Sequence, residues 1–263
     1  MVRKMAQLTC NFLSYSLRRA VSVSVILPTP TPSEVFEQNR LHRPADKYPV
    51  LYLLHGHGND HTTWMRYTSL ERYAEESNLA VVTFATENKF YVNHNNQDLF
   101  YDFIEKELPD FVLGLFPISP RREDTYIAGL SMGGFGALYH ALNNPARFRA
   151  FGAFSAGMRH TGFLPEADAV IGEERPDLFL LLDRVAGDIA DMPAGYMSCG
   201  TEDGLFALND EFQKKYIGLG GQLEWRAVAD YAHEWRFWDR EIQEFLAWIP
   251  RTDAYVGGRV RRV

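Results

Sequence analysis

The sequence has 263 residues, of which 46% are hydrophobic and 23% are charged, and its formal net charge is −7. This length and composition suit an ordinary globular protein, and we expect a single domain over residues 1–263. The negative charge repels phosphate backbones, so nucleic acid is not expected as a partner. The two cysteines, Cys10 and Cys199, are too few and too far apart for a disulfide framework or a zinc site.

The first residues are basic, but Gln7, Thr9 and Asn11 interrupt the apolar run that a signal peptide needs. No segment is apolar over the length that crosses a bilayer. We therefore expect a cytoplasmic protein with no membrane partner. The final stretch "VGGRVRRV", residues 256–263, contains glycine and basic residues and is typical of a flexible, solvated tail.

Strand-like and helix-like patterns alternate along the chain. The strand patterns cover residues 17–27, 48–56, 79–85, 124–130, 148–156, 194–200 and 222–229. The helix patterns cover a segment that starts with a capping box of Thr68 and Glu71, then residues 98–112, a segment from Ser131 to Asn143, and residues 205–219 and 235–248. This alternation predicts an α/β fold with a mostly parallel sheet and helices on both faces.

Residues 157–192 interrupt this rhythm, because they are longer than a simple connection between two strands. They include "DLFLLLDRVA", residues 177–186, which has the composition of a helix. Insertions on this architecture often cover a binding site, so we interpret the segment as a lid.

The stretch "GLSMG", Gly129 to Gly133, fits the pattern G-x-S-x-G between a predicted strand and a predicted helix. This is the context of a nucleophile elbow, in which a sharp turn exposes one serine above the sheet. The turn brings strand and helix so close that only glycine fits at positions 129 and 133. The pattern predicts that Ser131 is a nucleophile.

A serine nucleophile needs a base, and in this fold the base follows the acid in the chain. Three histidines follow Ser131: His140, His160 and His233. His140 lies inside the helix after the elbow, where we expect a structural role, and His160 lies in the insertion. His233 lies between the last predicted strand and the last predicted helix, from which a loop can return to the serine, so it is the predicted base.

The acid should follow the strand at residues 194–200. Asp203 is our choice, and Glu202 and Asp230 are the alternatives. Asp203 could also serve as a helix cap.

The oxyanion hole needs two backbone donors. One is the N–H of Met132, directly after the nucleophile. The other is expected from the glycine-containing loop "HGHGND" after the strand at residues 48–56, where the N–H of His57 is the predicted donor. The side chains of His55, His57, Asp60 and His61 could also suggest a metal site, but on a sharp loop they need not converge. We therefore expect no metal and no cofactor.

The segments "YLLHGHGND", "GLSMGGFGALYHALNNPARF", "CGTEDGL" and "HEWRFWDREIQEFLAW" together resemble the esterase D and tributyrin esterase group of α/β-hydrolases. Relatives of this group include S-formylglutathione hydrolases, feruloyl and acetyl xylan esterases, and mycolyltransferases. The resemblance implies an α/β-hydrolase fold with Ser131 as nucleophile, Asp203 as acid, His233 as base, and His57 and Met132 as oxyanion donors. Position 57 departs from the group, where an apolar residue is more usual.

These residues predict a serine carboxylesterase that hydrolyses short-chain acyl esters of small molecules. The sequence leaves the oligomeric state open, although homo-oligomers are common among such enzymes. The alternatives are a feruloyl or acetyl xylan esterase acting on an acylated sugar, an S-formylglutathione hydrolase, an acyltransferase, and a binding module without activity. Trp64, Trp235 and Trp238 flank the predicted site, where they could stack on a substrate or pack in the core.

Overall fold

The computed structural model describes residues 4–30, 35–37, 47–95, 97–158 and 176–253. Its framework is an eight-stranded sheet with the strand order β1-β2-β4-β3-β5-β6-β7-β8. The strands are β1 (Lys4–Ser14), β2 (Arg19–Thr29), β3 (Val50–Leu54), β4 (Ala80–Phe84), β5 (Thr125–Leu130), β6 (Ala150–Phe154), β7 (Ala194–Gly200) and β8 (Leu223–Val228). The pairs from β4 to β8 are parallel, whereas β2 is antiparallel to both β1 and β4. The predicted mostly parallel sheet is confirmed.

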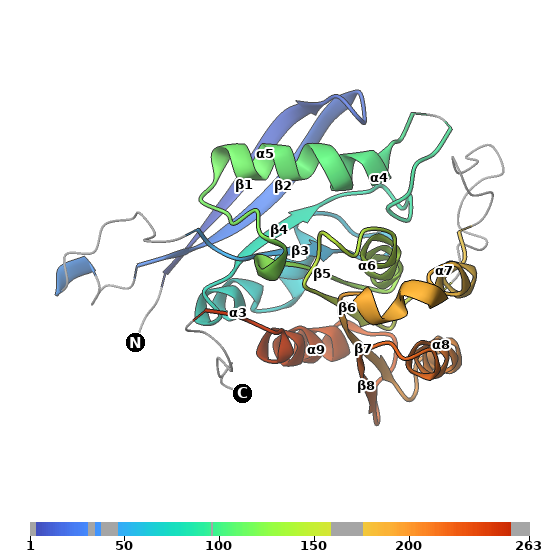
Figure 1. Cartoon of the computed structure of the whole chain (residues 1–263). Helices are drawn as coiled ribbons and strands as arrows, with labels where there is room; N and C mark the ends of the chain where they lie inside the picture. Colours follow the sequence, from blue (N-terminus) through green and yellow to red (C-terminus); the bar gives the residue numbers. More distant parts are fainter. Residues whose placement is uncertain (1–3, 31–34, 38–46, 96, 159–175, 254–263) are drawn as a thin grey trace.

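Helices cover both faces of this sheet, as the alternating pattern predicts (Figure 1). The helical segments are α2 (Thr63–Tyr67), α3 (Leu70–Glu76), α4 (Phe100–Asp102), η1 (Phe103–Glu107), α5 (Leu108–Leu115), η2 (Arg122–Asp124), α6 (Met132–Asn143), α7 (Leu178–Arg184), η3 (Ala186–Asp191), α8 (Phe206–Gly218) and α9 (Trp235–Trp248). α2, α3 and α9 pack on one face and α5, α6, α7 and α8 on the other, so two apolar cores form, one on each side of the sheet.

The central strands are buried on both faces. β3, β4, β5 and β6 have no exposed or half-buried residue. Such strands read as continuous apolar runs, because side chains that point to either face meet a helix. Their carboxyl ends share one edge of the sheet, which is where open α/β sheets place ligands.

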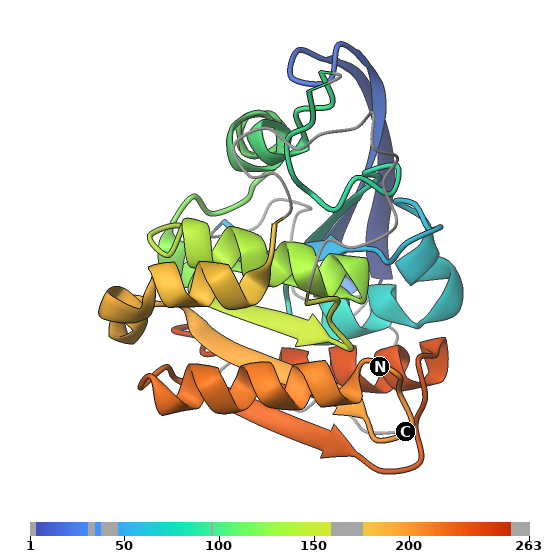
Figure 2. The ribbon, with the colours of Figure 1, turned by 90° about the vertical axis from the view of Figure 1, so that its right-hand side faces the viewer.

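β1 is not among the strands expected from the sequence. It forms an edge strand that pairs with β2 from Lys4↔Thr29 to Ser14↔Arg19, and the two strands make a long hairpin at one end of the molecule (Figure 2). Leu8, Cys10 and Phe12 alternate with polar residues, which is a period-two signal. The Phe12 ring stacks on Phe111 of α5 at 4.0 Å, so packing against this helix supports the hairpin.

The predicted capping box is wrong. α3 begins at Leu70 after the N-cap Ser69, and no side chain caps it. The Thr68 hydroxyl instead donates to the carbonyl of Trp64 at 2.6 Å and accepts from the Leu70 N–H at 3.1 Å. Thr68 therefore closes the short helix α2, and its hydroxyl does not accept from the Glu71 N–H as a capping box requires.

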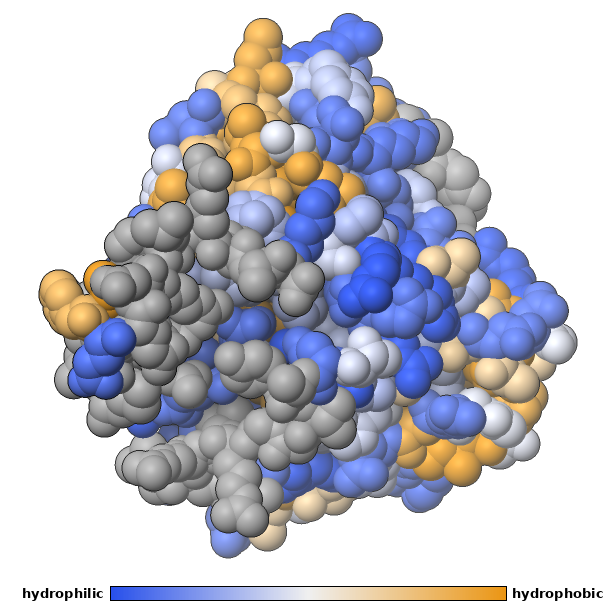
Figure 3. Space-filling view, turned by 60° about the vertical axis from the view of Figure 1, so that its left-hand side comes forward, coloured by the Kyte–Doolittle hydropathy of each residue, from blue (hydrophilic) through white to orange (hydrophobic). Residues whose placement is uncertain are grey.

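Part of the predicted insertion, residues 159–175, and the predicted tail, residues 256–263, lie outside the described residues. The predicted helix at residues 177–186 is present as α7, whose first N–H groups are capped by the Asp177 carboxylate. Among the described residues on the face in Figure 3, hydrophilic ones predominate, with separate hydrophobic areas. Among the described residues, none of the helices has the length and apolar character needed to cross a membrane.

Candidate active site

Ser131 occupies a sharp turn between β5 and α6. Its backbone has φ 53° and ψ −115°, a conformation that a residue with a side chain adopts at a cost of about 1–3 kcal/mol. Three backbone hydrogen bonds hold it there. The Ser131 N–H donates to the Phe154 carbonyl at 2.9 Å, and the Ser131 carbonyl accepts from Phe135 and Gly157 at 3.0 Å each. The neighbouring strand and helix therefore fix the strained residue.

The glycines around Ser131 permit this turn. A Cβ atom on Gly129 would lie 2.4 Å from the Gly133 carbonyl oxygen, and a Cβ atom on Gly133 would lie 2.5 Å from the Leu54 carbonyl oxygen. Both contacts are with backbone atoms, which cannot move aside without shifting a strand or a helix. The predicted need for glycine at positions 129 and 133 is confirmed.

Ser131, His233 and Asp203 form one chain of hydrogen bonds, although 102 residues separate the first two. The Ser131 Oγ lies 3.0 Å from the His233 Nε2, and the His233 Nδ1 lies 2.9 Å from the Asp203 Oδ2. Since the carboxylate can only accept, Nδ1 carries the proton and Nε2 is left to accept from the serine hydroxyl. In this arrangement the imidazole can take the proton from Ser131.

Asp203 is buried at the carboxyl end of β7, with 5% of its surface exposed. Burial opposes its charge, but hydrogen bonds from His233, from the Ser155 hydroxyl and from the Leu205 N–H hold the pKa of this carboxyl below its ordinary value. The Leu205 N–H donates to Oδ1 at 2.8 Å, while Oδ2 faces His233. Asp203 therefore caps the segment that leads into α8 and meets the imidazole at the same time.

The alternatives for the acid lie elsewhere. Glu202 is exposed, and its carboxylate accepts from the neighbouring Thr201 hydroxyl at 3.4 Å. Asp230 is exposed too, and its N–H donates to the same Thr201 hydroxyl at 3.3 Å. The structure therefore brings Asp203 to the imidazole and leaves these two carboxylates at the surface.

The other two histidines that follow Ser131 in the chain are His140 and His160. His140 is fully buried in α6, where Nδ1 pairs with Glu105 and Nε2 meets the Tyr91 carbonyl at 2.9 Å. It lies away from the serine hydroxyl, in agreement with the structural role expected for it. His160 lies outside the described residues.

The tryptophans near His233 mostly pack against each other. Trp238 meets the His233 ring edge-on at 4.9 Å between ring centroids, and it also contacts Trp235 at 5.3 Å. Trp64 and Trp238 are buried, with 0% and 5% of their surfaces exposed. Trp235 is half-buried and stacks on the exposed ring of Tyr67 at 4.8 Å. Trp64 and Trp238 therefore pack in the core.

The loop after β3 lies beside the nucleophile. A Cβ atom on Gly56 would be 3.6 Å from the Ser131 Cβ. The His55 Nδ1 meets the Gly56 carbonyl at 2.7 Å, and Nε2 accepts from the Thr86 N–H at 3.1 Å. Since a peptide unit is planar and trans, fixing the Gly56 carbonyl also fixes the direction of the His57 N–H on the other side of the same unit.

His55 holds this loop as a neutral imidazole. Burial is the largest influence on its pKa, which is lowered to about 4. The proton on Nδ1 then donates to the Gly56 carbonyl, and the unprotonated Nε2 accepts from Thr86. From the sequence, His55 is a candidate metal ligand only. Its position directly after a buried strand, next to Gly56, is the signal of a structural role.

Met132 supplies an N–H at the start of α6. As the first residue of the helix, it has no acceptor within the helix for its N–H. The helix dipole adds positive potential at the same place. The N–H groups of Met132 and His57 thus come from the two segments that flank Ser131, while the His57 side chain is exposed.

The polar residues of the loop after β3 have other partners than a metal. The His61 Nδ1 bonds the Ser24 hydroxyl at 2.8 Å, and the Asp60 carboxylate accepts from the backbone and hydroxyl of Thr62. Within the described ranges, no group of three or more His, Cys, Asp or Glu side chains is arranged to hold a metal ion.

Comparison with known proteins identifies the family. The sequence profile of the esterase family, described as "Putative esterase", matches residues 14–249. The chain belongs to this esterase family. An acetyl esterase of Caldicellulosiruptor saccharolyticus is 25% identical to it in an alignment that covers 94% of this chain and 99% of that protein.

Solved structures agree with this assignment. The fluorophosphonate-binding serine hydrolase FphF of Staphylococcus aureus is 30% identical, with a TM-score of 0.79 over 93% of this chain and 98% of its own. The S-formylglutathione hydrolase FrmB of Staphylococcus aureus is also 30% identical, with a TM-score of 0.78 over 94% and 99%. The predicted α/β-hydrolase fold is therefore confirmed, and the esterase is a serine ester hydrolase.

Proposed function

We propose that this esterase is a serine carboxylesterase that hydrolyses short-chain acyl esters through an acyl-enzyme on Ser131. The observation that carries the proposal is the continuous hydrogen-bonded chain from the Ser131 Oγ through His233 to Asp203. In this proposal Ser131 is the nucleophile, His233 the general base and Asp203 the acid that orients the base.

The reaction follows from these positions. His233 Nε2 takes the hydroxyl proton as the Ser131 Oγ attacks the ester carbonyl carbon. The backbone N–H groups of His57 and Met132 stabilise the resulting oxyanion. The bond to the alcohol oxygen then breaks, His233 gives its proton to that oxygen, and the acyl group stays on Ser131. A water molecule repeats these steps on the acyl-enzyme and releases the carboxylic acid.

The known relatives support a small acyl group. One is an acetyl esterase, and another is an S-formylglutathione hydrolase. Acetyl and formyl are the two smallest acyl groups. A ferulic acid esterase has the same fold with a TM-score of 0.76 at 24% identity, which is a likeness of fold alone.

Hydrolysis of p-nitrophenyl esters from acetyl to octanoyl, and of the feruloyl ester, tests the proposal. We expect wild type to prefer the short esters and Ser131→Ala to fall to background, because the nucleophile is then absent. A fluorophosphonate probe should label wild type, with the adduct on Ser131 by mass spectrometry, and should leave Ser131→Ala unlabelled. Activity retained in Ser131→Ala would show that another residue is the nucleophile.

Two added substrates separate the alternatives. A thioester such as S-formylglutathione, turned over faster than every oxygen ester, would favour a thioester hydrolase. An alcohol acceptor at high concentration distinguishes a transferase, since a transferase forms a new ester where a hydrolase releases mainly acid.

A further inference from the structure

Tyr91 is a fully buried residue that contacts the loop after β3. Its hydroxyl donates to the His55 carbonyl at 2.6 Å, and 0% of its surface is exposed. Burial raises the pKa of this phenol, so it keeps its proton and acts as a donor. The His55 carbonyl lies one residue before the Gly56–His57 peptide unit, whose N–H is proposed above as an oxyanion donor.

The His55 carbonyl is confined between two segments. A Cβ atom on Gly133 would lie 2.7 Å from this oxygen, so the start of α6 limits its movement on one side. The Tyr91 hydroxyl, from another segment of the chain, holds the same oxygen by a hydrogen bond. Since α6 also carries Ser131 at its N-cap, the contact with Gly133 sets the distance from the loop to the nucleophile, and Tyr91 holds the loop against that contact.

Tyr91 is itself held in a strained conformation. Its backbone φ is 65° and that of Phe90 is 50°, both in the left-handed region that non-glycine residues rarely adopt. The Tyr91 carbonyl accepts from the His140 Nε2 at 2.9 Å. The Tyr91 ring lies against α6 at Gly136, where a Cβ atom would be 2.5 Å from the ring. Backbone strain persists only where surrounding contacts enforce it, and here α6 supplies them.

The support for Tyr91 extends further into the protein. His140 bonds Glu105 through Nδ1, and Glu105 pairs with Arg147 at 2.7 Å. Burial opposes the charge of Glu105, but His140 and Arg147 hold the pKa of its carboxyl below its ordinary value. The carboxylate is thus fixed between two donors, and His140 is fixed in turn. Hydrogen bonds thus lead from Arg147 through Glu105 and His140 to the Tyr91 backbone, and the Tyr91 side chain carries the contact on to the His55 carbonyl.

We propose that Tyr91 is a positioning residue for the oxyanion hole, supported by His140 and Glu105 and acting through the His55 carbonyl. This inference rests on the proposed function, since it concerns the same Ser131 chemistry. Tyr91 does not touch the reacting atoms. Its hydroxyl keeps the loop at the distance from Ser131 at which the His57 N–H meets the developing negative charge.

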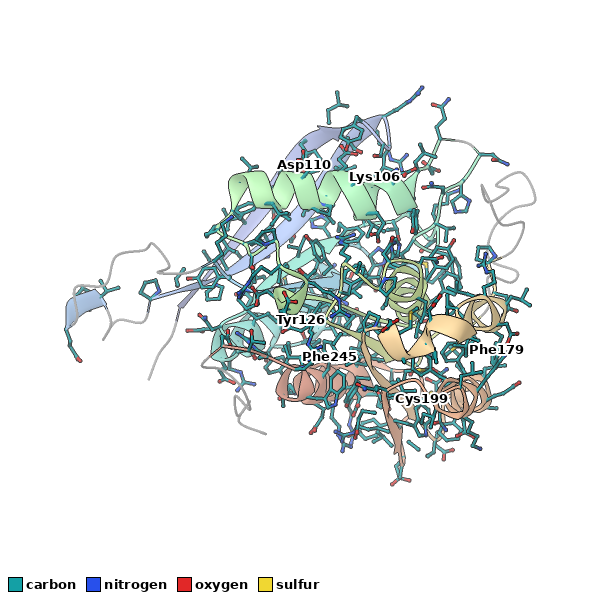
Figure 4. All side chains as sticks on the ribbon, viewed as in Figure 1. Lys106, Asp110, Tyr126, Phe179, Cys199 and Phe245 are labelled. Atoms are coloured by element: carbon teal, nitrogen blue, oxygen red, sulfur yellow. The ribbon has the colours of Figure 1, made fainter. Side chains whose placement is uncertain are left out.

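The test is Tyr91→Phe beside the matched control Tyr126→Phe. Tyr126 is also buried, and its hydroxyl donates to the carbonyls of Glu123 and Pro250 at 3.1 Å each. Tyr126, which is labelled in Figure 4, lies near the start of β5. Ser131 follows the end of this strand. Each variant removes one buried hydroxyl that donates to backbone, and each should lower Tm by about 2–4 °C.

For p-nitrophenyl acetate we expect Tyr91→Phe to lower kcat roughly tenfold with KM changed less than about twofold, against 10²–10³ for loss of a whole donor. The inhibition constant of an aryl trifluoromethyl ketone, which forms an oxyanion on the serine, should rise by the same factor. Tyr126→Phe should leave kcat and this inhibition constant at the wild-type values. The pH profile of kcat/KM should keep its shape in both variants, since neither touches His233.

Two results would overturn the inference. One is a Tyr91→Phe variant whose kcat matches that of Tyr126→Phe, and the other is a fall in kcat without weaker inhibition by the ketone. Ser131→Ala separates this failure from failure of the proposed function. If Ser131→Ala is inactive while Tyr91→Phe behaves like the control, the nucleophile stands and Tyr91 has only a structural role.

Discussion

Gly129 and Gly133 face each other so closely that a Cβ atom on Gly129 would lie 2.4 Å from the carbonyl oxygen of Gly133. This contact joins the end of β5 to the first turn of α6 on either side of Ser131. It explains how a serine can occupy a positive-φ position, because no side chain separates the strand from the helix. The close approach has a direct consequence for substitutions.

Gly133→Ala should damage both stability and activity. The new Cβ atom would meet the carbonyl oxygens of Leu54 and His55 at 2.5 and 2.7 Å, so the loop or the helix must move. Overpacking of this kind costs about 1–3 kcal/mol in the free energy of unfolding. We expect kcat/KM to fall at least about 100-fold, since small displacements of catalytic groups have effects of that size.

Gly114→Ala is the matched control for this prediction. Gly114 lies in α5, and a Cβ atom there would have nothing within 4 Å. Denaturant unfolding and ester hydrolysis should show wild-type activity and equal or slightly greater stability for this variant, because alanine favours helix over glycine. Full activity in Gly133→Ala would contradict the close packing of the elbow against the loop.

Asp203→Asn should separate the two contacts of this carboxylate. Asparagine still offers an oxygen to the Leu205 N–H, but it no longer holds His233 with a negative charge. The corresponding change in a serine protease lowers kcat by about 10⁴. We expect a loss of about 10²–10⁴ in kcat, measured on p-nitrophenyl acetate. Stability at neutral pH should fall as well, because the folded protein favours the ionised carboxylate that asparagine lacks.

Glu202→Gln is the control for the choice of acid. Its side chain is exposed, so activity within about twofold of wild type is expected, as for most surface substitutions. If Glu202→Gln were the inactive variant and Asp203→Asn the active one, the acid would be Glu202 and the hydrogen bond from His233 to Asp203 would be incidental.

The buried imidazole of His55 should make the folded protein less stable in mild acid. Its pKa is lowered from 6.5 to about 4 by burial, so between these values the unfolded chain binds a proton that the folded protein does not. The stability from neutral His55 is therefore complete above about pH 6.5 and decreases as the pH falls toward 4. The total loss is about 3 kcal/mol in the free energy of unfolding.

Urea unfolding at several pH values from 7 to 4 measures this loss. His55→Gln removes the titrating group and should have a shallower dependence on pH, whereas the loop control His57→Gln should keep the wild-type slope. Asp203 adds little to this slope, because its pKa is held below the ordinary value of an aspartate, so most of its contribution is lost in stronger acid. Equal slopes in wild type and His55→Gln would mean that His55 is not the group responsible.

Local patterns were sufficient for most of the fold. Continuous apolar runs predict strands that are buried on both faces, and β7 and α9 begin and end at the predicted residues. The hairpin strand β1 is not predicted, because its alternating polar residues also fit an interrupted apolar segment. The π-helical turn η1 also escaped prediction, since the helical spacing of apolar residues at 98–112 does not distinguish a π-turn from an α-turn.

A strand, G-x-S-x-G and a helix in succession are enough to predict the elbow, because this order restricts the local backbone to a sharp turn. Long-range packing selects the carboxylate that meets His233, since Glu202 and Asp203 are adjacent in the chain and only packing buries one and exposes the other. It also decided the roles of His55 and Tyr91. Their hydrogen bonds join segments more than 30 residues apart, and such contacts leave no local pattern in the sequence.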